Sequence, residues 1–261
     1  MRIQTLISTM NRTDVGFLNS MNIETDVVVG NQNGRDFIEQ IELAGRTVYL
    51  VNSSGRGLSK NRNITVKYSD ADICVLADDD IEYCKGYANI IESAFCTHPD
   101  ADLIVFNLFE NPIERHVIKK THRIRGLEFL RYGSVRIAFK RDSIYGRILF
   151  DERFGAGGEI PIGEDTIFLG DCLKAGLKAY ACPQYILSLK PSESTWFKGF
   201  DESYFINKGK MYYRIFGRFS DFIILQDAFR HRRMYSKCGN PFRIIKLMKN
   251  GKKDFKNAKK N

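Results

Sequence analysis

Long apolar runs, prolines and paired cysteines are scarce in this sequence of 261 residues. No run approaches the roughly 18 apolar residues of a membrane-spanning helix, and the first residues lack the longer apolar stretch of a signal peptide. Six prolines and 21 glycines exclude collagen-like and low-complexity chains. None of the six cysteines forms a CxxC pair, so neither a zinc site nor a disulfide framework is predicted. We therefore expect a cytoplasmic protein.

Charge is distributed unevenly along the chain, while apolar residues (43%) and aromatic residues (12%) suffice for a substantial core. Residues 230–261 hold 12 Lys and Arg against one acid, whereas the preceding 229 residues hold 28 basic and 30 acidic side chains. The near-neutral body argues against nucleic acid as a partner. The basic C-terminal segment is suited to an anionic surface such as phospholipid headgroups.

Apolar runs alternate with amphipathic stretches, which is typical of an α/β fold. The pattern predicts a mostly parallel central sheet with helices on both faces, connected by right-handed crossovers, plus a helical C-terminal extension. The predicted strands cover residues 3–7, 26–29, 47–51, 71–77, 101–108, 136–140 and 179–189. The predicted helices cover residues 14–21, 57–69, 88–96, 164–175, 201–216 and 219–230.

Three adjacent carboxylates, Asp78, Asp79 and Asp80, follow one of the buried strands. Like charges at such a position are unfavourable unless a cation compensates them. Ligands of open α/β sheets bind at the carboxyl ends of the strands, and magnesium and manganese favour carboxylates together with phosphate oxygens. The triplet therefore indicates a divalent cation that holds a diphosphate. A solvated acidic turn is the alternative.

Two other polar segments begin predicted helices. In GLSKNRN at residues 57–63, Arg62 could meet a phosphate or a carboxylate, although a capped helix with a solvated arginine would look the same. Glu164 and Asp165 follow Gly163 after a glycine-rich stretch. A carboxylate there could act as a general base, although the helix dipole alone favours acids in a first turn. No P-loop or GxGxxG motif is present.

These segments, together with Ser8-Thr9-Met10-Asn11 after the first strand, resemble the ordered motifs of a family two glycosyltransferase with the GT-A fold. The resemblance covers about residues 3–200. It implies a GT-A domain that moves one sugar from a nucleotide-sugar, UDP-linked, to a glycan or lipid-linked saccharide in bacterial surface-polysaccharide synthesis. Because the QxxRW motif of processive members is absent around the only tryptophan, Trp196, single additions are expected.

The resemblance also implies a role for individual residues. It implies nucleotide contacts by Thr9, Asn11, Asn31, Arg62, Asp78 and Asp79. It further implies Asp80 and Asp78 as ligands of Mn²⁺ or Mg²⁺, Asp165 as the catalytic base, and Glu164 as a residue that positions the acceptor or a loop. Asn31 stands where the family usually has an acid that reads the base, which leaves that contact open. A single base without a second, nucleophilic carboxylate implies inversion at the anomeric carbon.

Three regions follow from this reading: a GT-A domain (1–200), a helical part packed on it (201–242) and a basic tail (243–261). In the tail, Ile244, Leu247 and Met248 share one helical face, which predicts a basic amphipathic helix on anionic lipid at the inner face of the membrane. A solvated tail is the alternative.

Two other functions remain open at this point. A nucleotidyltransferase shares a similar core, but it should carry a Gly- and Arg-rich phosphate loop after the first strand, which residues 8–11 do not provide. A non-catalytic, basic membrane-surface adaptor would explain the tail but not the aspartate triplet.

Overall fold

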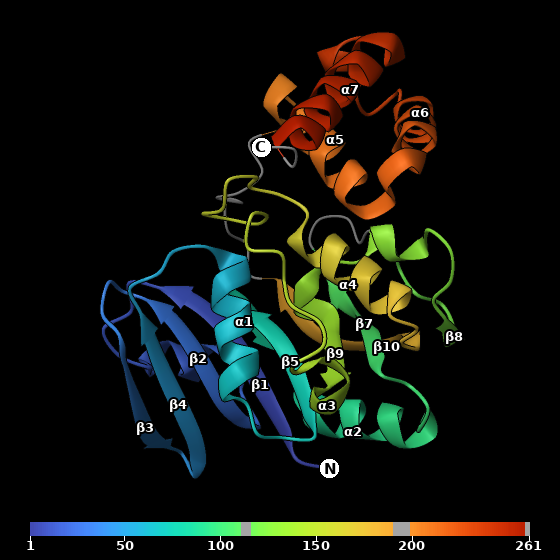
Figure 1. Cartoon of the computed structure of the whole chain (residues 1–261). Coiled ribbons are helices and arrows are strands. Elements are labelled where there is room, and N and C mark those ends of the chain that lie inside the picture. Colours follow the sequence, from blue (N-terminus) through green and yellow to red (C-terminus); the bar gives the residue numbers. More distant parts are fainter. Residues whose placement is uncertain (111–115, 190–198, 259–261) are drawn as a thin grey trace.

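The computed structural model describes residues 1–110, 116–189 and 199–258 (Figure 1). Trp196, on which the expectation of single additions depends, lies outside these residues. The strands are β1 (Ile3–Met10), β2 (Asp26–Gln32), β3 (Phe37–Leu43), β4 (Arg46–Ser53), β5 (Ile73–Asp78), β6 (Ile81–Tyr83), β7 (Leu103–Phe109), β8 (His122–Arg123), β9 (Ile137–Lys140) and β10 (Ala179–Leu189). The α-helices are α1 (Leu58–Tyr68), α2 (Tyr87–Thr97), α3 (Arg141–Ile144), α4 (Glu164–Lys174), α5 (Glu202–Phe216), α6 (Ser220–Arg230) and α7 (Pro241–Ala258).

One sheet organises the molecule, in the strand order β3-β4-β2-β1-β5-β9-β7-β10-β6, with β8 beside β10. The pairs β1–β2, β1–β5, β2–β4 and β7–β10 are parallel. Strand β9 lies antiparallel between β5 and β7. Six strands consequently run in one direction, which confirms the predicted mostly parallel sheet, and their carboxyl ends share one edge.

Alternate residues of the central strands enter two hydrophobic clusters, one on each face of the sheet. Leu6 and Cys74 belong to the cluster covered by α1, α4 and the C-terminal helices, whereas Ile7 and Val75 belong to the cluster covered by α2. This alternation follows from the two-residue period of a strand. It explains why the central strands read as continuous apolar runs, since both faces are buried.

The sequence pattern missed three strands, two of which are very short. Strand β3 carries mostly exposed residues on the outer edge of the sheet, so it lacks the apolar run that marks its neighbours. Strands β6 and β8 have only three and two residues. The helix predicted over residues 14–21 is present as a 3₁₀ helix, η1 (Gly16–Met21), that ends at Asn22 in the left-handed region.

The three C-terminal helices gather at one end of the molecule (Figure 1). Helices α5 and α7 approach closely, because a Cβ atom on Gly209 would lie 1.9 Å from the Met248 carbonyl oxygen and one on Gly251 would lie 1.8 Å from that of Ile206. The side chains of Ile244 and Met248 are completely buried in this packing.

Residues 243–258 are therefore not a separate tail, since a boundary at 243 falls inside α7. The prediction that the face of Ile244 and Met248 contacts lipid is wrong for this structure, because that face covers α5. Among the described residues, no helix combines the length and apolar character needed to cross a bilayer.

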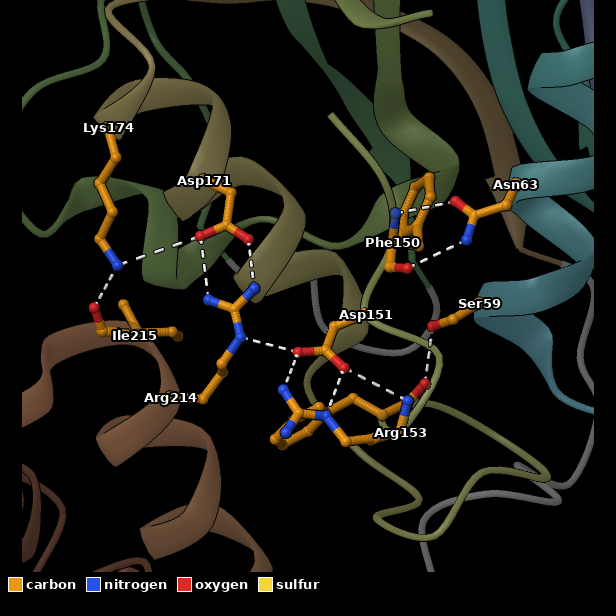
Figure 2. A network of polar contacts seen from close by, with 10 residues as sticks. Ser59, Asn63, Phe150, Asp151, Arg153, Asp171, Lys174, Arg214 and Ile215 are labelled. Carbon is orange, nitrogen blue, oxygen red and sulfur yellow. Dashed lines mark hydrogen bonds and ion pairs between the residues drawn. The ribbon is translucent and has the colours of Figure 1, made fainter. Parts of the chain in front are cut away.

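Arg214 of α5 joins the C-terminal helices to the α/β body (Figure 2). Its Nε donates to Asp151 at 2.7 Å, and its Nη1 and Nη2 donate to both carboxylate oxygens of Asp171 on α4 at 3.1 and 2.7 Å. Burial alone would raise the pKa of Asp151, but the donors Arg153 and Arg214 lower it to about 2. The guanidinium thus fixes α5 against both α4 and the loop that precedes it.

We predict that Arg214→Gln lowers the free energy of unfolding by about 3 kcal/mol at pH 7, because two largely buried carboxylates lose their shared cation. Arg243→Gln is the matched control, since Arg243 pairs with Glu202 at the exposed surface. The control should lose less than about 1 kcal/mol. Urea unfolding followed by circular dichroism measures both values, and equal losses would contradict the assignment.

Candidate active site

Polar side chains from four neighbouring strands meet at the carboxyl edge of the sheet. In the register, Thr9 of β1 lies opposite Asn31 of β2, and Asn31 lies opposite Asn52 of β4. On the other side of β1, Ser8 lies opposite Asp78 at the end of β5. The structure therefore brings together the segments that were predicted from the sequence to share one site.

Helix α1 is fixed above this edge by three polar side chains. Asn61 donates to the carbonyl oxygens of Gly30 (2.8 Å) and Thr9 (3.3 Å). A Cβ atom on Gly30 would lie 2.2 Å from the Asn61 side-chain oxygen, so only glycine permits this approach. Ser59 donates to the Phe154 carbonyl oxygen, and Asn63 exchanges two hydrogen bonds with the backbone of Phe150 (Figure 2).

Arg62, on the same helix, forms the centre of the site. Its side chain is only 2% exposed, and it pairs with Asp78 and with Glu164, each at 3.1 Å. Burial lowers the pKa of the guanidinium, but the charges of Asp78, Glu164 and Asp165 outweigh that effect and raise it. Arg62 is thus the internal counter-ion of carboxylates from two distant segments. Because its side chain is buried between these carboxylates, the structure shows Arg62 on internal partners, and the nucleotide contact that the resemblance implied stays a prediction.

The two acids at the start of α4 have raised pKa values. Burial raises the pKa of Glu164 to about 7, and the neighbouring Asp165 carboxylate adds to the shift. Burial also raises the pKa of Asp165, against the opposing effect of Arg62. Asp165 accepts a hydrogen bond from the Thr166 backbone N–H at 2.7 Å. A carboxylate with a raised pKa is a better proton acceptor near neutral pH than an ordinary one.

The three aspartates have different surroundings. Asp78 pairs with Arg62, while Asp79 accepts hydrogen bonds from Thr9 and from Arg12, whose Nη2 lies 2.7 Å away. Asp80 lies exposed at the turn before β6. The division explains how three adjacent carboxylates coexist, since two of them have arginine partners. Arg12 was not predicted, because a single arginine in a polar loop carries no pattern.

Asn31 and Asn11 shape the loop after β1. The Asn31 side chain is fully buried, accepts from the Arg12 backbone N–H at 3.1 Å and donates to the Arg12 carbonyl and to Asn52. In this arrangement it holds the loop instead of facing a base. Asn11 is exposed, adopts a positive φ of 56°, and its backbone N–H donates to the Gln32 carbonyl.

The donor atoms at Asp78–Asp80 fit a hard divalent cation, because all of them are carboxylate oxygens. Within residues 1–110, 116–189 and 199–258, no group of three or more His, Cys, Asp or Glu side chains is arranged as a metal site. Magnesium usually takes one or two carboxylates and completes its shell with water and substrate phosphate, so such a cage is not required. Asp80 and Asp78 are the side chains that would hold the cation.

Comparison with solved structures decides the fold. No family model and no curated protein matches the chain. A crystal structure of S. aureus TarS residues 1–349 matches with a TM-score of 0.60 at 14% identity, covering 90% of this chain and 72% of that one. The fold is GT-A. A longer TarS structure matches with a TM-score of 0.61 at 14% identity, and the match covers 91% of this chain and 44% of that one. TarS 1–349 in complex with UDP-GlcNAc matches with a TM-score of 0.58 at 14% identity, and the match covers 91% of this chain and 74% of that one.

We predict that Arg62→Met lowers the free energy of unfolding by about 3–5 kcal/mol at pH 8, because Asp78 and Glu164 lose a buried counter-ion. The loss should be smaller at pH 6. The pKa of Glu164 is raised above its unfolded value, so its protonation stabilises the folded state below about pH 7, and losing Arg62 strengthens this effect.

Urea unfolding at both pH values measures the difference. Arg62→Lys, which keeps one positive charge, is the control and should lose less at pH 8. A loss that is the same at pH 6 and pH 8 would contradict the coupling between Arg62 and Glu164.

Proposed function

We propose that this protein is a glycosyltransferase that moves one sugar from a nucleotide-sugar to the hydroxyl group of a glycan or lipid-linked saccharide. The observation that carries the proposal is the pairing of Asp78 and of Glu164 with the buried Arg62, at the carboxyl edge of a GT-A sheet. In this arrangement Asp78 and the aspartates that follow it would lie beside the diphosphate of the donor. Glu164 and Asp165 would lie beside the acceptor. Synthesis of bacterial surface polysaccharide at the inner face of the membrane is the setting that we propose.

The donor in this proposal is UDP-linked. TarS, which shares the fold, has been crystallised with UDP-GlcNAc and with UDP. In this chain, Asn11, Arg12 and Asp79 lie around the end of β1, where they would meet the nucleoside part of the donor. Mn²⁺ or Mg²⁺, held by Asp80 and Asp78, would neutralise charge on the diphosphate.

Asp165 is the base in this proposal, and the displacement is a single step. The Asp165 carboxylate takes the proton of the acceptor hydroxyl as the oxygen forms a bond to the anomeric carbon. The bond from that carbon to the diphosphate oxygen breaks, and UDP leaves with the electron pair. Attack from the side opposite to UDP inverts the anomeric configuration. Glu164, held by Arg62, fixes the first turn of α4 and thereby the position of Asp165.

A panel of nucleotide-sugars, incubated with the protein and Mn²⁺, tests the function through release of the nucleoside diphosphate. We expect release from UDP-sugars, and Asp80→Asn should abolish both release and Mn²⁺-dependent UDP binding while the circular dichroism spectrum is retained. Release of pyrophosphate from nucleoside triphosphates would instead identify a nucleotidyltransferase. Absence of any metal-dependent nucleotide binding would identify a non-catalytic adaptor.

Asp165→Asn should reduce turnover by about 10²-fold or more and leave UDP affinity nearly unchanged, because only the transition state uses this proton transfer. Steady-state kinetics and calorimetry with UDP give the two values. A parallel loss of affinity and turnover would make Asp165 a structural residue. In the wild type, an NMR spectrum of the product should show the anomer opposite to that of the donor, and retention would refute the single displacement.

A further inference from the structure

Helix α6 has two apolar faces, and only one of them is covered. Its inner face is buried, whereas Phe222, Leu225 and Phe229 recur on the outer face at intervals of three and four residues. Phe219 precedes the helix on the same side, and Phe242 of α7 continues the row, with its ring 6.0 Å from that of Phe229. We define these five residues as the α6 stripe.

The α6 stripe is unusual for a protein surface. Its five side chains are between 42% and 72% exposed. Six phenylalanines are strongly exposed in the part of the chain that the structure describes, and four of them belong to the stripe. Single exposed apolar residues are ordinary, but a contiguous group of them marks an interaction site.

The surface around the stripe is strongly cationic. Residues 217–258 contain eleven Lys and Arg against three acids. Two of these acids are neutralised within the protein, because Asp221 pairs at 2.6 Å with Lys252, which is one of the eleven, and Asp227 pairs at 3.0 Å with Lys208 of α5. Arg232 and Arg233, in the turn after α6, are exposed. A partner must therefore combine an apolar region with negative charge.

We propose that the α6 stripe and its cationic surround dock on an anionic lipid bilayer, with the aromatic rings at the level of the headgroups. Aromatic side chains flanked by Lys and Arg are the pattern of interfacial helices, and each basic residue near an anionic leaflet adds to the attraction. A second copy of this chain fits less well, since a twofold axis through the stripe would bring the same cations face to face.

The proposal replaces the lipid contact that was predicted for the face of Ile244 and Met248, which is buried. It does not depend on the proposed function, but it would serve it. Helix α5 connects the helices that carry the α6 stripe to the candidate active site. Its Met211 lies against Gly163, directly before α4, and its Arg214 pairs with Asp171 on α4. Docking would thus present the candidate active site to acceptors that are confined to the membrane plane.

Sedimentation with vesicles of phosphatidylglycerol and phosphatidylcholine in equal parts tests the proposal, with pure phosphatidylcholine vesicles as the lipid control. The wild type should bind the anionic vesicles only, and less tightly at high salt. The double variant Phe222→Gln, Phe229→Gln should bind at least about tenfold more weakly, because two rings leave the interface. Phe37→Gln with Phe109→Gln, two exposed phenylalanines outside the stripe, is the matched control and should bind as the wild type does.

Three results would overturn the proposal. They are no binding by the wild type, equal binding by the stripe variant and the wild type, and a wild-type dimer in analytical ultracentrifugation that the stripe variant converts to monomer. The last result would assign the surface to a second copy. Release of UDP from the donor without vesicles should be unchanged in the stripe variant, so a failure of docking is distinguishable from a failure of the proposed function.

Discussion

The pairing of the buried Arg62 guanidinium with Asp78 and Glu164 is the constraint on which the candidate site depends. The two carboxylates come from segments 86 positions apart, and the largely buried Glu164 carboxylate would be costly to hold there without a cation. Asp165 follows Glu164 directly, so the same pairing locates the residue that we propose as the base. One arginine thereby connects the proposed donor and acceptor sides of the site.

This arginine is held in place by the helix that carries it. Asn61 joins α1 to the carboxyl ends of β1 and β2, and Ser59 and Asn63 join it to the loop before α4. Arg214 then connects that loop and α4 to the C-terminal helices. The polar residues of GLSKNRN therefore act mainly as internal connections. The part of the site open to solvent comes from the exposed residues after β1 and β5.

The buried strands and the general location of the site could be predicted from sequence, because continuous apolar runs that end in polar residues are local signals. The partner that each polar side chain contacts could not be predicted in the same way, because it depends on residues far away in the sequence. Arg62 and Asn31 were expected to face the nucleotide, yet both are buried, since their partners Glu164 and Asn52 lie far away in the sequence. The helix face that carries Met248 was expected to contact lipid. Amphipathic spacing predicts that a helix has an apolar face, but it does not predict which part of the protein covers that face.

Crystals grown with UDP and Mn²⁺ offer the most direct test of the claim that Arg62 organises one site for donor and base. An anomalous difference map should place the manganese beside the Asp80 carboxylate. The electron density should show the diphosphate on the cation and Arg62 still between Asp78 and Glu164. A manganese peak elsewhere in the molecule, or an Arg62 side chain that leaves Glu164 to bind the phosphates, would contradict the account.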